Sequence, residues 1–283
     1  MKKIKLSVVL ATHNEEASLG RCLGSVKDIA NEIVIADEQS SDKTVEIAKK
    51  FAAKVISAPH NDNFHITKNI AIASATGDWI LQLDADEVVS PELAREIQSH
   101  LKGGRKDSFQ VNGYWMNRKN WFLTRFLTKG GQYPDPTLRL YRRGKGRLPA
   151  NDVHEQAVVD GSVGHLTHDL LHYRDTSFAK YLDGFNRYST FASLQMQDRH
   201  QPLGIWPAIN YLMIKPLVTF SVIYFRHLGI VDGYPGFVFA LFSGLTHAVA
   251  YIKYWQKSKY PITSPQPSPE FRRGGSAKVE GEV

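Results

Sequence analysis

Cysteine is almost absent from this chain of 283 residues, which contains only Cys22. A disulfide framework within the chain is therefore excluded, and a buried structural thiol is a commoner role for such a residue than a nucleophile. The apolar stretch before Thr12 is six or seven residues long, too short for a secretory signal. We therefore expect the protein to stay in the cytoplasm.

Two phosphate-binding motifs are also missing. A dinucleotide-dependent dehydrogenase needs Gly-x-Gly-x-x-Gly after its first strand, where this chain has Ala-Thr-His-Asn at 11–14. The loop Gly-x-x-x-x-Gly-Lys-Ser/Thr of P-loop nucleotidases does not occur in the sequence. Hydrophobic residues make up 42% of the chain, which is enough to bury a full core and excludes a disordered or fibrous protein.

Charge is distributed unevenly along the chain. Residues 1–100 contain 11 Lys and Arg against 15 Asp and Glu, whereas residues 101–283 contain 24 against 13. The basic excess coincides with the most apolar part of the sequence, a combination that suits a membrane surface with anionic lipid. A basic nucleic-acid-binding protein is an alternative, but aromatic and basic residues do not interleave as they would on a base-stacking platform.

Residues 4–86 alternate short apolar runs with helix-like segments, the pattern of a parallel sheet with crossover helices. We expect strands at 6–11, 31–37, 54–57 and 79–83, and helices at 16–26, 42–52 and 63–75. Further strands are predicted at 109–116 and 138–142. The first, second and fourth strands end in polar residues, at the edge where open α/β sheets bind ligands.

The fourth predicted strand ends abruptly in three acidic residues, Asp84, Asp86 and Glu87. Residues two apart on a strand project to the same side, so Asp84 and Asp86 can share a divalent cation or divide a cation and a sugar hydroxyl between them. A solvated acidic turn is the alternative, because Ser90-Pro91-Glu92 is a good start for a helix.

Several separated segments carry a family resemblance. In order, these are Leu-Ser-Val-Val-Leu-Ala-Thr-His-Asn-Glu-Glu at 6–16, Asp-Glu-Gln-Ser-Ser-Asp-Lys-Thr at 37–44, Lys-Asn at 68–69, Gly-Asp-Trp at 77–79 and Asp-Ala-Asp-Glu at 84–87. As a set they resemble family 2 of the inverting glycosyltransferases. Segments 138–143, 153–155, 172–173 and 229–236 are similar to the subgroup that adds sugars to the inner core of lipopolysaccharide, such as heptose β-1,4-glucosyltransferases.

The resemblance implies an α/β fold of the GT-A type, a Rossmann-like mixed sheet with flanking helices, followed by C-terminal membrane-associating helices. The expected domains are a catalytic domain at 1–200, with a nucleotide-sugar half (1–100) and an acceptor half (101–200), and a membrane-associating helical segment at 201–260. The composition of 261–283, rich in Pro, Ser, Gly and charge, predicts a disordered tail.

A nucleotide-diphosphate sugar is the implied donor, with UDP-glucose as the leading candidate. The carboxylate of Asp37 and the polar loop containing Thr12, Asn14 and Glu15 can pair with a base. Lys68 is expected near the base or the diphosphate, as a charge without the bidentate fork of arginine. A helix cap is the alternative role for Asp37, although Ser40, Ser41 or Asp42 can perform that role.

Metal dependence is implied as well. Asp86 would ligate Mg²⁺ or Mn²⁺, hard ions that prefer oxygen ligands, while Asp84 would hold the ribose or share the ion. His172 would be a third ligand, although a lone histidine on an apolar segment is more often a hydrogen-bonded core residue. Arg139 would face the sugar diphosphate or an acidic acceptor, with a solvated edge strand as the alternative.

Inversion at the anomeric carbon requires a base that deprotonates the acceptor hydroxyl on the face opposite the leaving group. Glu155 is the candidate base, Asp152 is its competitor, and His154 would orient Glu155 or the diphosphate. A surface carboxylate is the alternative reading of Glu155.

The C-terminal apolar runs, 216–225 and 236–252, are shorter than the roughly 20 residues that span a bilayer, and Pro202, Pro207 and Pro216 are expected to break up the first. We expect helices lying in the cytoplasmic leaflet of the inner membrane, as a peripheral or monotopic protein. A buried helical pair and a spanning hairpin are alternatives. The implied acceptor is a lipid-linked saccharide such as a lipopolysaccharide core intermediate; another polysaccharide or glycolipid acceptor and an inactive membrane scaffold are the alternatives.

Overall fold

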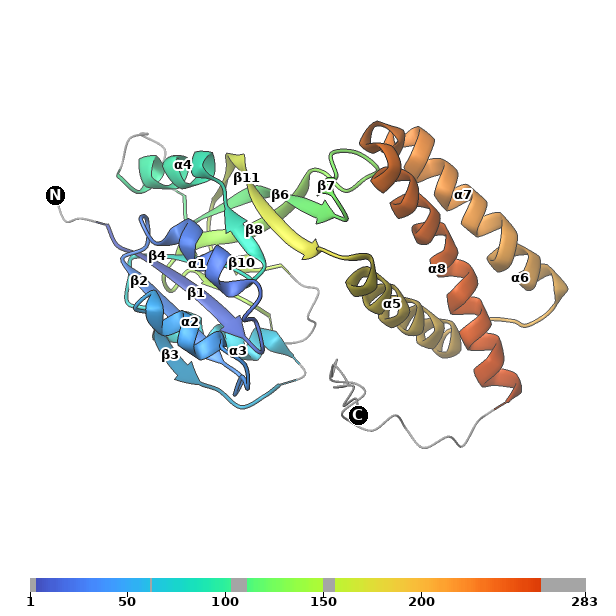
Figure 1. The fold of residues 1–283 in the computed structure, drawn as a ribbon, viewed down its shortest axis with the longest axis horizontal. Coiled ribbons are helices and arrows are strands. Elements are labelled where there is room, and N and C mark those ends of the chain that lie inside the picture. The colour runs from blue at the N-terminus through green and yellow to red at the C-terminus, as the bar shows by residue number, and fades with distance from the viewer. Residues whose placement is uncertain (1–3, 62, 103–110, 150–155, 261–283) are drawn as a thin grey trace, which may run out of the picture. The chain divides into compact units, whose positions relative to one another are not determined.

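The computed structural model describes residues 4–61, 63–102, 111–149 and 156–260. The chain forms two compact units, one of Met1–Asp183 with Ser221–Ala240 and one of Gly184–Phe220 with Leu241–Val283. Helix α5 (Phe178–Asp198) begins in the first unit and ends in the second. The first unit contains the sheet (Figure 1).

The parallel half of the sheet is built from four strands in the order β3-β2-β1-β4. Their bounds are β1 (Leu6–Thr12), β2 (Glu32–Asp37), β3 (Lys54–Ser57) and β4 (Trp79–Gln82). Each lies within one residue of its predicted position. The predicted crossover helices are confirmed as well, as α1 (Leu19–Val26), α2 (Thr44–Lys50) and α3 (Phe64–Ser74).

The other half of the sheet is mixed and continues from β4 in the order β8-β6-β11-β5, with β7 paired to β6. The strands are β5 (Glu87–Val89), β6 (Gly113–Phe122), β7 (Arg125–Phe126), β8 (Asp135–Arg142) and β11 (Val163–Asp175). A separate ribbon pairs β9 (Gly146–Arg147) with β10 (Val158–Val159). Strand β8 is therefore an interior strand, between β4 and β6.

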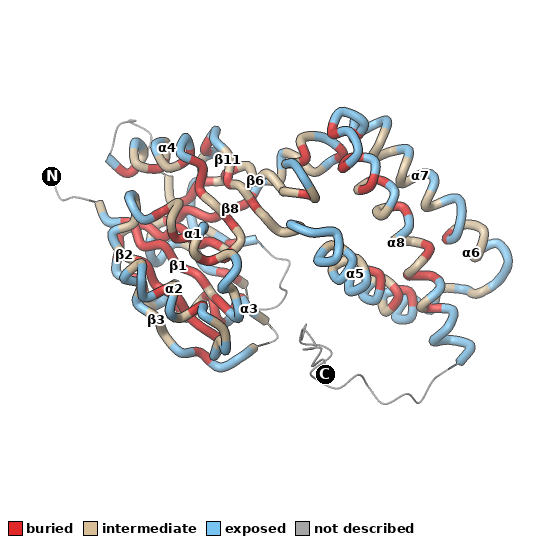
Figure 2. The backbone as a smooth tube through the Cα atoms, in the orientation of Figure 1, coloured by how far each residue is buried: buried red, intermediate tan, exposed pale blue. Residues whose placement is uncertain are grey.

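Alternate residues of the central strands enter two cores on opposite faces of the sheet, as the two-residue period of a strand requires. On β1, Val8 and Leu10 join the core that contains buried residues of α1, α2 and α4 (Pro91–Leu101). Val9 joins the other core, together with Ala71 of α3. Figure 2 shows these strands as the most continuously buried part of the first unit.

Helix α4 begins as the sequence predicts, directly after the acidic segment. The hydroxyl of Ser90 accepts a hydrogen bond from the Leu93 amide (3.2 Å), and Pro91 occupies the first helical position. The acidic segment itself is not the solvated turn of the alternative reading, because Glu87 is fully buried in β5.

The C-terminal region contains two long helices. The first runs without interruption over Ile205–Arg226 (22 residues) as α6 (Ile205–Ile209), the π-helical η2 (Asn210–Ile214), α7 (Lys215–Ser221) and the π-helical η3 (Val222–Arg226). The second covers Gly229–Lys259 (31 residues) as the short 3-10 segment η4 (Gly229–Asp232) and α8 (Gly233–Lys259). Both are long and apolar enough to cross a membrane by length and composition alone, which is weak evidence for membrane association.

The expectation that prolines break up the first of these helices is wrong. Pro207 lies in the first turn, where its missing N–H would have no intrahelical partner in any case. Pro216 lies inside the helix, as the second residue of α7 and two residues after the end of η2. The wider π-helical turn relieves the clash between a proline ring and the carbonyl four residues earlier, so the helix continues.

Within the second unit the long helices approach each other closely. A side chain at Gly244 of α8 would place its Cβ 2.5 Å from the Pro216 carbonyl oxygen, so only glycine permits this distance. The rings of Tyr211 and Tyr251 stack with centroids 5.3 Å apart. Lys253 donates to the Asn186 side chain on α5 (2.7 Å).

Asp232 ties the start of the second apolar helix to the sheet of the first unit. Its buried carboxylate accepts hydrogen bonds from the Thr128 amide (3.0 Å), the Thr128 hydroxyl (2.8 Å) and the Lys129 amide (2.8 Å). These donors belong to the loop between β7 and β8. Because these donors are partly buried, water cannot easily replace the Asp232 carboxylate as their hydrogen-bond acceptor.

We predict that Asp232→Ala lowers the free energy of unfolding by about 1–3 kcal/mol, because it leaves these donors unsatisfied. Urea unfolding of the purified protein measures the change. Glu46→Ala is the matched control, since Glu46 forms an exposed pair with Lys50 (2.9 Å) that should contribute nothing measurable. Equal unfolding midpoints for wild type and Asp232→Ala would contradict the assignment.

Candidate functional site

Asp37 ends β2 at the carboxyl edge of the sheet, and its carboxylate is held in one orientation. It accepts hydrogen bonds from the Thr12 hydroxyl at the end of β1 (2.8 Å), the Ser40 amide (2.9 Å) and the Ser40 hydroxyl (2.6 Å). Asp37 does not cap α2, because the Thr44 amide donates to Asp42 instead (2.9 Å). The carboxylate therefore belongs to the polar edge of the sheet.

The loop after β1 is joined to the loop after β2. The Asn14 amide donates to the Ser40 hydroxyl (2.9 Å), and the Ser41 amide donates to Asn14 Oδ1 (2.9 Å). Asn14 adopts a left-handed conformation (φ 55°), which asparagine tolerates better than most residues. Thr12, Asn14 and Asp37, all expected to contact a nucleotide, thus lie in one hydrogen-bonded network.

Glu15 lies within electrostatic reach of the acidic pair. Burial raises the pKa of Glu15 above its ordinary value, the hydrogen bond from Ser18 (2.5 Å) opposes this, and the charge of Asp86 adds to it. A partly buried carboxylate with a raised pKa beside other carboxylates is typical of a functional site.

Asp84 lies two residues after the end of β4, and cations engage both of its carboxylate oxygens. Lys68 of α3 pairs with Oδ1, and the Arg139 guanidinium contacts Oδ2 (2.5 Å). Although burial opposes ionisation, Arg139 and Lys68 hold the pKa of Asp84 well below its usual range. Asp84 is therefore an anion whose charge is already compensated within the protein.

Arg139 reaches this position from the interior strand β8. The pairing of β8 with β6 shifts between Tyr114↔Leu140 and Trp115↔Leu138, so Arg139 lies at a bulge. A bulge redirects a side chain, and here the buried guanidinium contacts Gln82, Asp84 and Glu87 (2.7 Å to Glu87 Oε1). The solvated edge strand considered from the sequence does not occur.

Glu87 is the residue at this site to which sequence reasoning assigned no role. It is fully buried, and its Oε2 accepts a hydrogen bond from the Asp84 amide (3.0 Å). Its Oε1 contacts Arg139 (2.7 Å) and Arg118 (3.3 Å), and Arg118 also pairs with Asp135 (2.8 Å). The third acid in Asp-Ala-Asp-Glu was visible in the sequence, but its arginine partners on β6 and β8 were not.

Asp86 faces His172 of β11. Asn120 donates its Nδ2 to Asp135 (3.0 Å), which leaves its Oδ1 to accept from His172 Nδ1 (2.7 Å). The other ring nitrogen, Nε2, lies 3.4 Å from Asp86 Oδ2. Because Nδ1 donates its proton to Asn120, Nε2 of the neutral ring carries a lone pair. A lone pair on Nε2 and the Asp86 oxygen at this distance require a proton or a metal ion between them.

The residues present therefore fit a divalent metal ion at Asp86 and His172. Burial opposes ionisation of Asp86, but the contact with His172 keeps the pKa of Asp86 below its ordinary value. A carboxylate beside an imidazole whose tautomer is fixed by a hydrogen bond is a typical metal-ligand arrangement. The metal-binding roles of Asp84, Asp86 and His172 stay predictions.

The predicted catalytic residues Asp152, His154 and Glu155 lie outside the described residues. Before that segment, the Pro149 carbonyl oxygen contacts His65 Nδ1 (2.7 Å) on α3, the helix that carries Lys68. After it, Gln156 accepts from the Thr137 hydroxyl (3.2 Å) on β8, the strand that carries Arg139. Both flanks thus adjoin elements of the acidic site.

A family model supplies the identification. Residues 7–166 match the model described as Glycosyl transferase family 2, which is more than half of the chain. The chain belongs to glycosyltransferase family 2. It is therefore a glycosyltransferase, and the predicted GT-A-type mixed sheet with flanking helices agrees with the fold described above.

Two relatives span nearly the same length as this family 2 chain. It is 30% identical over 271 residues to the lipopolysaccharide core biosynthesis glycosyltransferase LpsC of Rhizobium meliloti, covering 91% of this chain and 96% of the relative. It is 28% identical to the uncharacterized glycosyltransferase RT0209 of Rickettsia typhi, covering 83% and 81%. The resemblance to enzymes of lipopolysaccharide core assembly is thus supported at the level of sequence.

Solved structures show weaker likeness to this family 2 enzyme. S. aureus TarS 1–349 in complex with UDP-GlcNAc has a TM-score of 0.45 and 15% identity, covering 87% of this chain and 82% of that one. Glucosyl-3-phosphoglycerate synthase from Mycobacterium tuberculosis, in complex with Mn²⁺, UDP and glucosyl-3-phosphoglycerate, has a TM-score of 0.33 and 20% identity, covering 42% of this chain and 44% of that one.

Removing the buried charge of Glu87 should weaken both the fold and the site. We expect Glu87→Gln to lower the free energy of unfolding by about 3–5 kcal/mol, because Arg139 and Arg118 lose a buried counter-charge. Guanidinium unfolding measures this. Glu92→Gln is the control, because Glu92 pairs with Arg95 on the exposed face of α4 (2.9 Å). A loss no larger than that of the control would show that the network does not depend on Glu87.

Proposed function

We propose that this family 2 enzyme transfers a sugar, with inversion, from a nucleoside diphosphate sugar to a lipid-linked saccharide. The observation that carries the proposal is the acidic pair Asp84 and Asp86 at the carboxyl edge of the sheet, with Lys68 and Arg139 bound to Asp84. A diphosphate needs positive charge, and a transferred sugar needs hydrogen-bond acceptors. Lys68 and Arg139 supply the positive charge, and the two aspartates supply the hydrogen-bond acceptors, within one site.

The nucleoside half of the donor fits the network around Asp37. That carboxylate is fixed by Thr12 and Ser40 and can accept a hydrogen bond from an imide N–H, which uracil has. Asn14 and Glu15 lie on the adjoining loop. UDP-glucose is our leading donor. We choose it because of the likeness to lipopolysaccharide core enzymes and because the Asp37 carboxylate can accept a hydrogen bond from the uracil base.

Asp86 and His172, with Asp84 beside them, would hold a Mg²⁺ or Mn²⁺ ion. When bound, such an ion supplies Lewis-acid neutralisation of the departing diphosphate. Asp84 is better suited to accept a ribose or sugar hydroxyl, because Lys68 and Arg139 already compensate its charge. Lys68 can also exchange its contact with Asp84 for a phosphate oxygen, since a lysine ammonium makes non-directional contacts.

The acceptor hydroxyl must lose a proton as the new glycosidic bond forms and the bond to diphosphate breaks. Glu155 is our candidate for the base, with Asp152 as its competitor and His154 as the residue that orients Glu155. A positioned base contributes about 10²- to 10⁴-fold in rate. In-line displacement on the face opposite the leaving group inverts the anomeric configuration.

The acceptor is proposed to be a lipopolysaccharide core intermediate, reached from the cytoplasmic face of the inner membrane. Three observations support this: the likeness to LpsC, the two long apolar helices and the basic excess in residues 101–283. Another glycolipid or polysaccharide acceptor is the second candidate. An inactive scaffold is disfavoured, because Asp37, Asp84, Asp86 and Glu155 are all present in the sequence, and loss of function should remove at least one of them.

The test is transfer of labelled sugar from a panel of nucleoside diphosphate sugars to a lipopolysaccharide core acceptor, with Mn²⁺ or chelator. We expect turnover with one donor, its loss on chelation and a loss of at least about 10³-fold for Asp86→Asn, because neutralisation of the leaving diphosphate is among the largest catalytic contributions. Donor binding is followed separately by thermal stabilisation.

Asp160→Asn is the matched control, since Asp160 forms an exposed pair with Arg147 (3.3 Å) away from the acidic pair. Full activity of Asp86→Asn would overturn the metal assignment. If a donor stabilises the protein but no sugar is transferred to the core acceptor, the proposed donor site stands and the proposed acceptor is wrong.

A further inference from the structure

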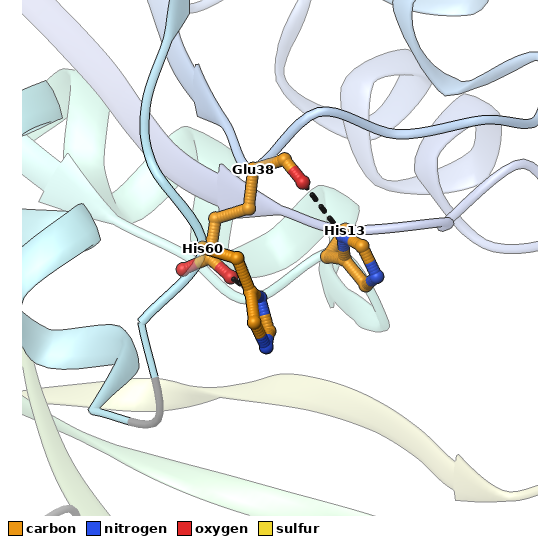
Figure 3. Close-up of side chains that lie close together, drawn as sticks. All are labelled: His13, Glu38 and His60. Atoms are coloured by element: carbon orange, nitrogen blue, oxygen red, sulfur yellow. Dashed lines mark hydrogen bonds and ion pairs between the residues drawn. The ribbon is translucent and has the colours of Figure 1, made fainter. Parts of the chain in front are cut away.

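A second cluster of metal-ligating side chains lies at the same edge of the sheet. His13 directly follows β1, Glu38 directly follows β2, and His60 lies three residues after β3 (Figure 3). One ligand atom from each residue lies within 4.8 Å of the other two. It is the only such group of three among the described residues. None of the three has a role in the function proposed above.

Glu38 forms a rigid base for this cluster. Its side chain is only 6% exposed. The hydroxyl of Thr67 on α3 donates to Oε1 (2.5 Å), and His60 Nδ1 contacts Oε2 (2.6 Å). A buried carboxylate held on both oxygens stays in place while the more exposed histidines adjust, as a metal site requires.

The hydrogen bonds of His13 determine which of its ring nitrogens is free for a metal. Nδ1 lies 2.7 Å from the Glu38 carbonyl oxygen, which can only accept, so Nδ1 carries the proton. Nε2 then presents a lone pair, and the nearby Asn14 amide group (3.3 Å) is a donor consistent with it. Metal-binding histidines usually donate their second N–H to a carbonyl or carboxylate in this way.

We propose that His13, Glu38 and His60 form a binding site for a borderline transition-metal ion of the Zn²⁺ class. Two imidazole nitrogens and one carboxylate oxygen are a donor set that suits Zn²⁺ and Co²⁺, whereas Mg²⁺ prefers oxygen ligands alone. The ring centroids of His13 and His60 are 5.1 Å apart, so small side-chain movements suffice to bring both nitrogens to one ion. The remaining positions would be filled by solvent.

A comparison within the chain separates this cluster from an ordinary surface pair. His168 Nδ1 contacts Glu96 Oε2 at 2.8 Å, and His168 is 47% exposed against 44% for His60. The Glu96 carboxylate also accepts hydrogen bonds from the backbone amides of Thr167 and His168. That pair has one histidine, whereas the Glu38 cluster has two.

The ion would have a structural effect on the neighbouring nucleotide network. It would join the loop after β1 to the loop after β2, and Glu38 directly follows Asp37 in sequence. Metal binding does not depend on the proposed glycosyl transfer, so either proposal can fail while the other stands.

The test is titration of the chelator-treated full-length protein with Zn²⁺ by calorimetry, and with Co²⁺ by visible absorption, in excess Mg²⁺ and without nucleotide. We expect one Zn²⁺ per chain and intense visible bands of low-coordinate Co²⁺. His60→Ala should weaken Zn²⁺ binding by at least about tenfold and abolish the bands. His168→Ala and Asp86→Asn should bind as the wild type does.

Absence of Zn²⁺ binding to the wild type, or unchanged binding in His60→Ala, would overturn the proposal. Loss of binding in Asp86→Asn would move the ion to the acidic pair instead. Circular dichroism and a thermal melt of His60→Ala in the metal-free state establish that it is folded, as the exposure of His60 predicts. His13→Gln is the second variant and should give the same loss.

Discussion

The buried guanidinium of Arg139 is the constraint on which the rest of the site depends. A cation inside a sheet is stable only where carboxylates compensate it, because desolvation of an unpaired charge costs several kcal/mol. Asp84 and Glu87 provide that compensation, and Glu87 also accepts the Asp84 amide. The segment Asp-Ala-Asp-Glu at 84–87 is thereby fixed to the interior strand β8, and the position of Asp86 follows from it.

This arrangement gives the two aspartates different chemistry. Asp84 is neutralised by Lys68 and Arg139, whereas Asp86 faces only His172 at 3.4 Å among the polar contacts described here. A metal ion at Asp86 would thus find few protein ligands and would need oxygens from a diphosphate to complete its coordination. Metal binding and donor binding should therefore be coupled.

Much of the parallel half of the fold could be predicted, because alternating apolar strands and crossover helices leave a clear periodic signal from Leu6 to Gln82. The acidic pair was recognised from the motif Asp-Ala-Asp-Glu, although its two aspartates lie in the turn between β4 and β5 and not on a strand. Arg139 could not be placed, because a bulge between paired strands leaves no signal in one sequence. The continuous helix through Pro216 was missed, since a π-helical turn depends on packing. His60 lies in a loop, and its proximity to His13 arises only when β1 and β3 flank β2 in the sheet.

The most direct measurement is Mn²⁺ binding followed by electron paramagnetic resonance, with and without uridine diphosphate. Mn²⁺ binds weakly to nitrogen-rich sites, so the signal reports mainly on Asp86 and its surroundings. We expect weak binding of Mn²⁺ by the protein alone and much tighter binding when the nucleotide is present. Equally tight binding of Mn²⁺ without nucleotide would contradict this expectation, because Asp86 and His172 would then need no help from the diphosphate.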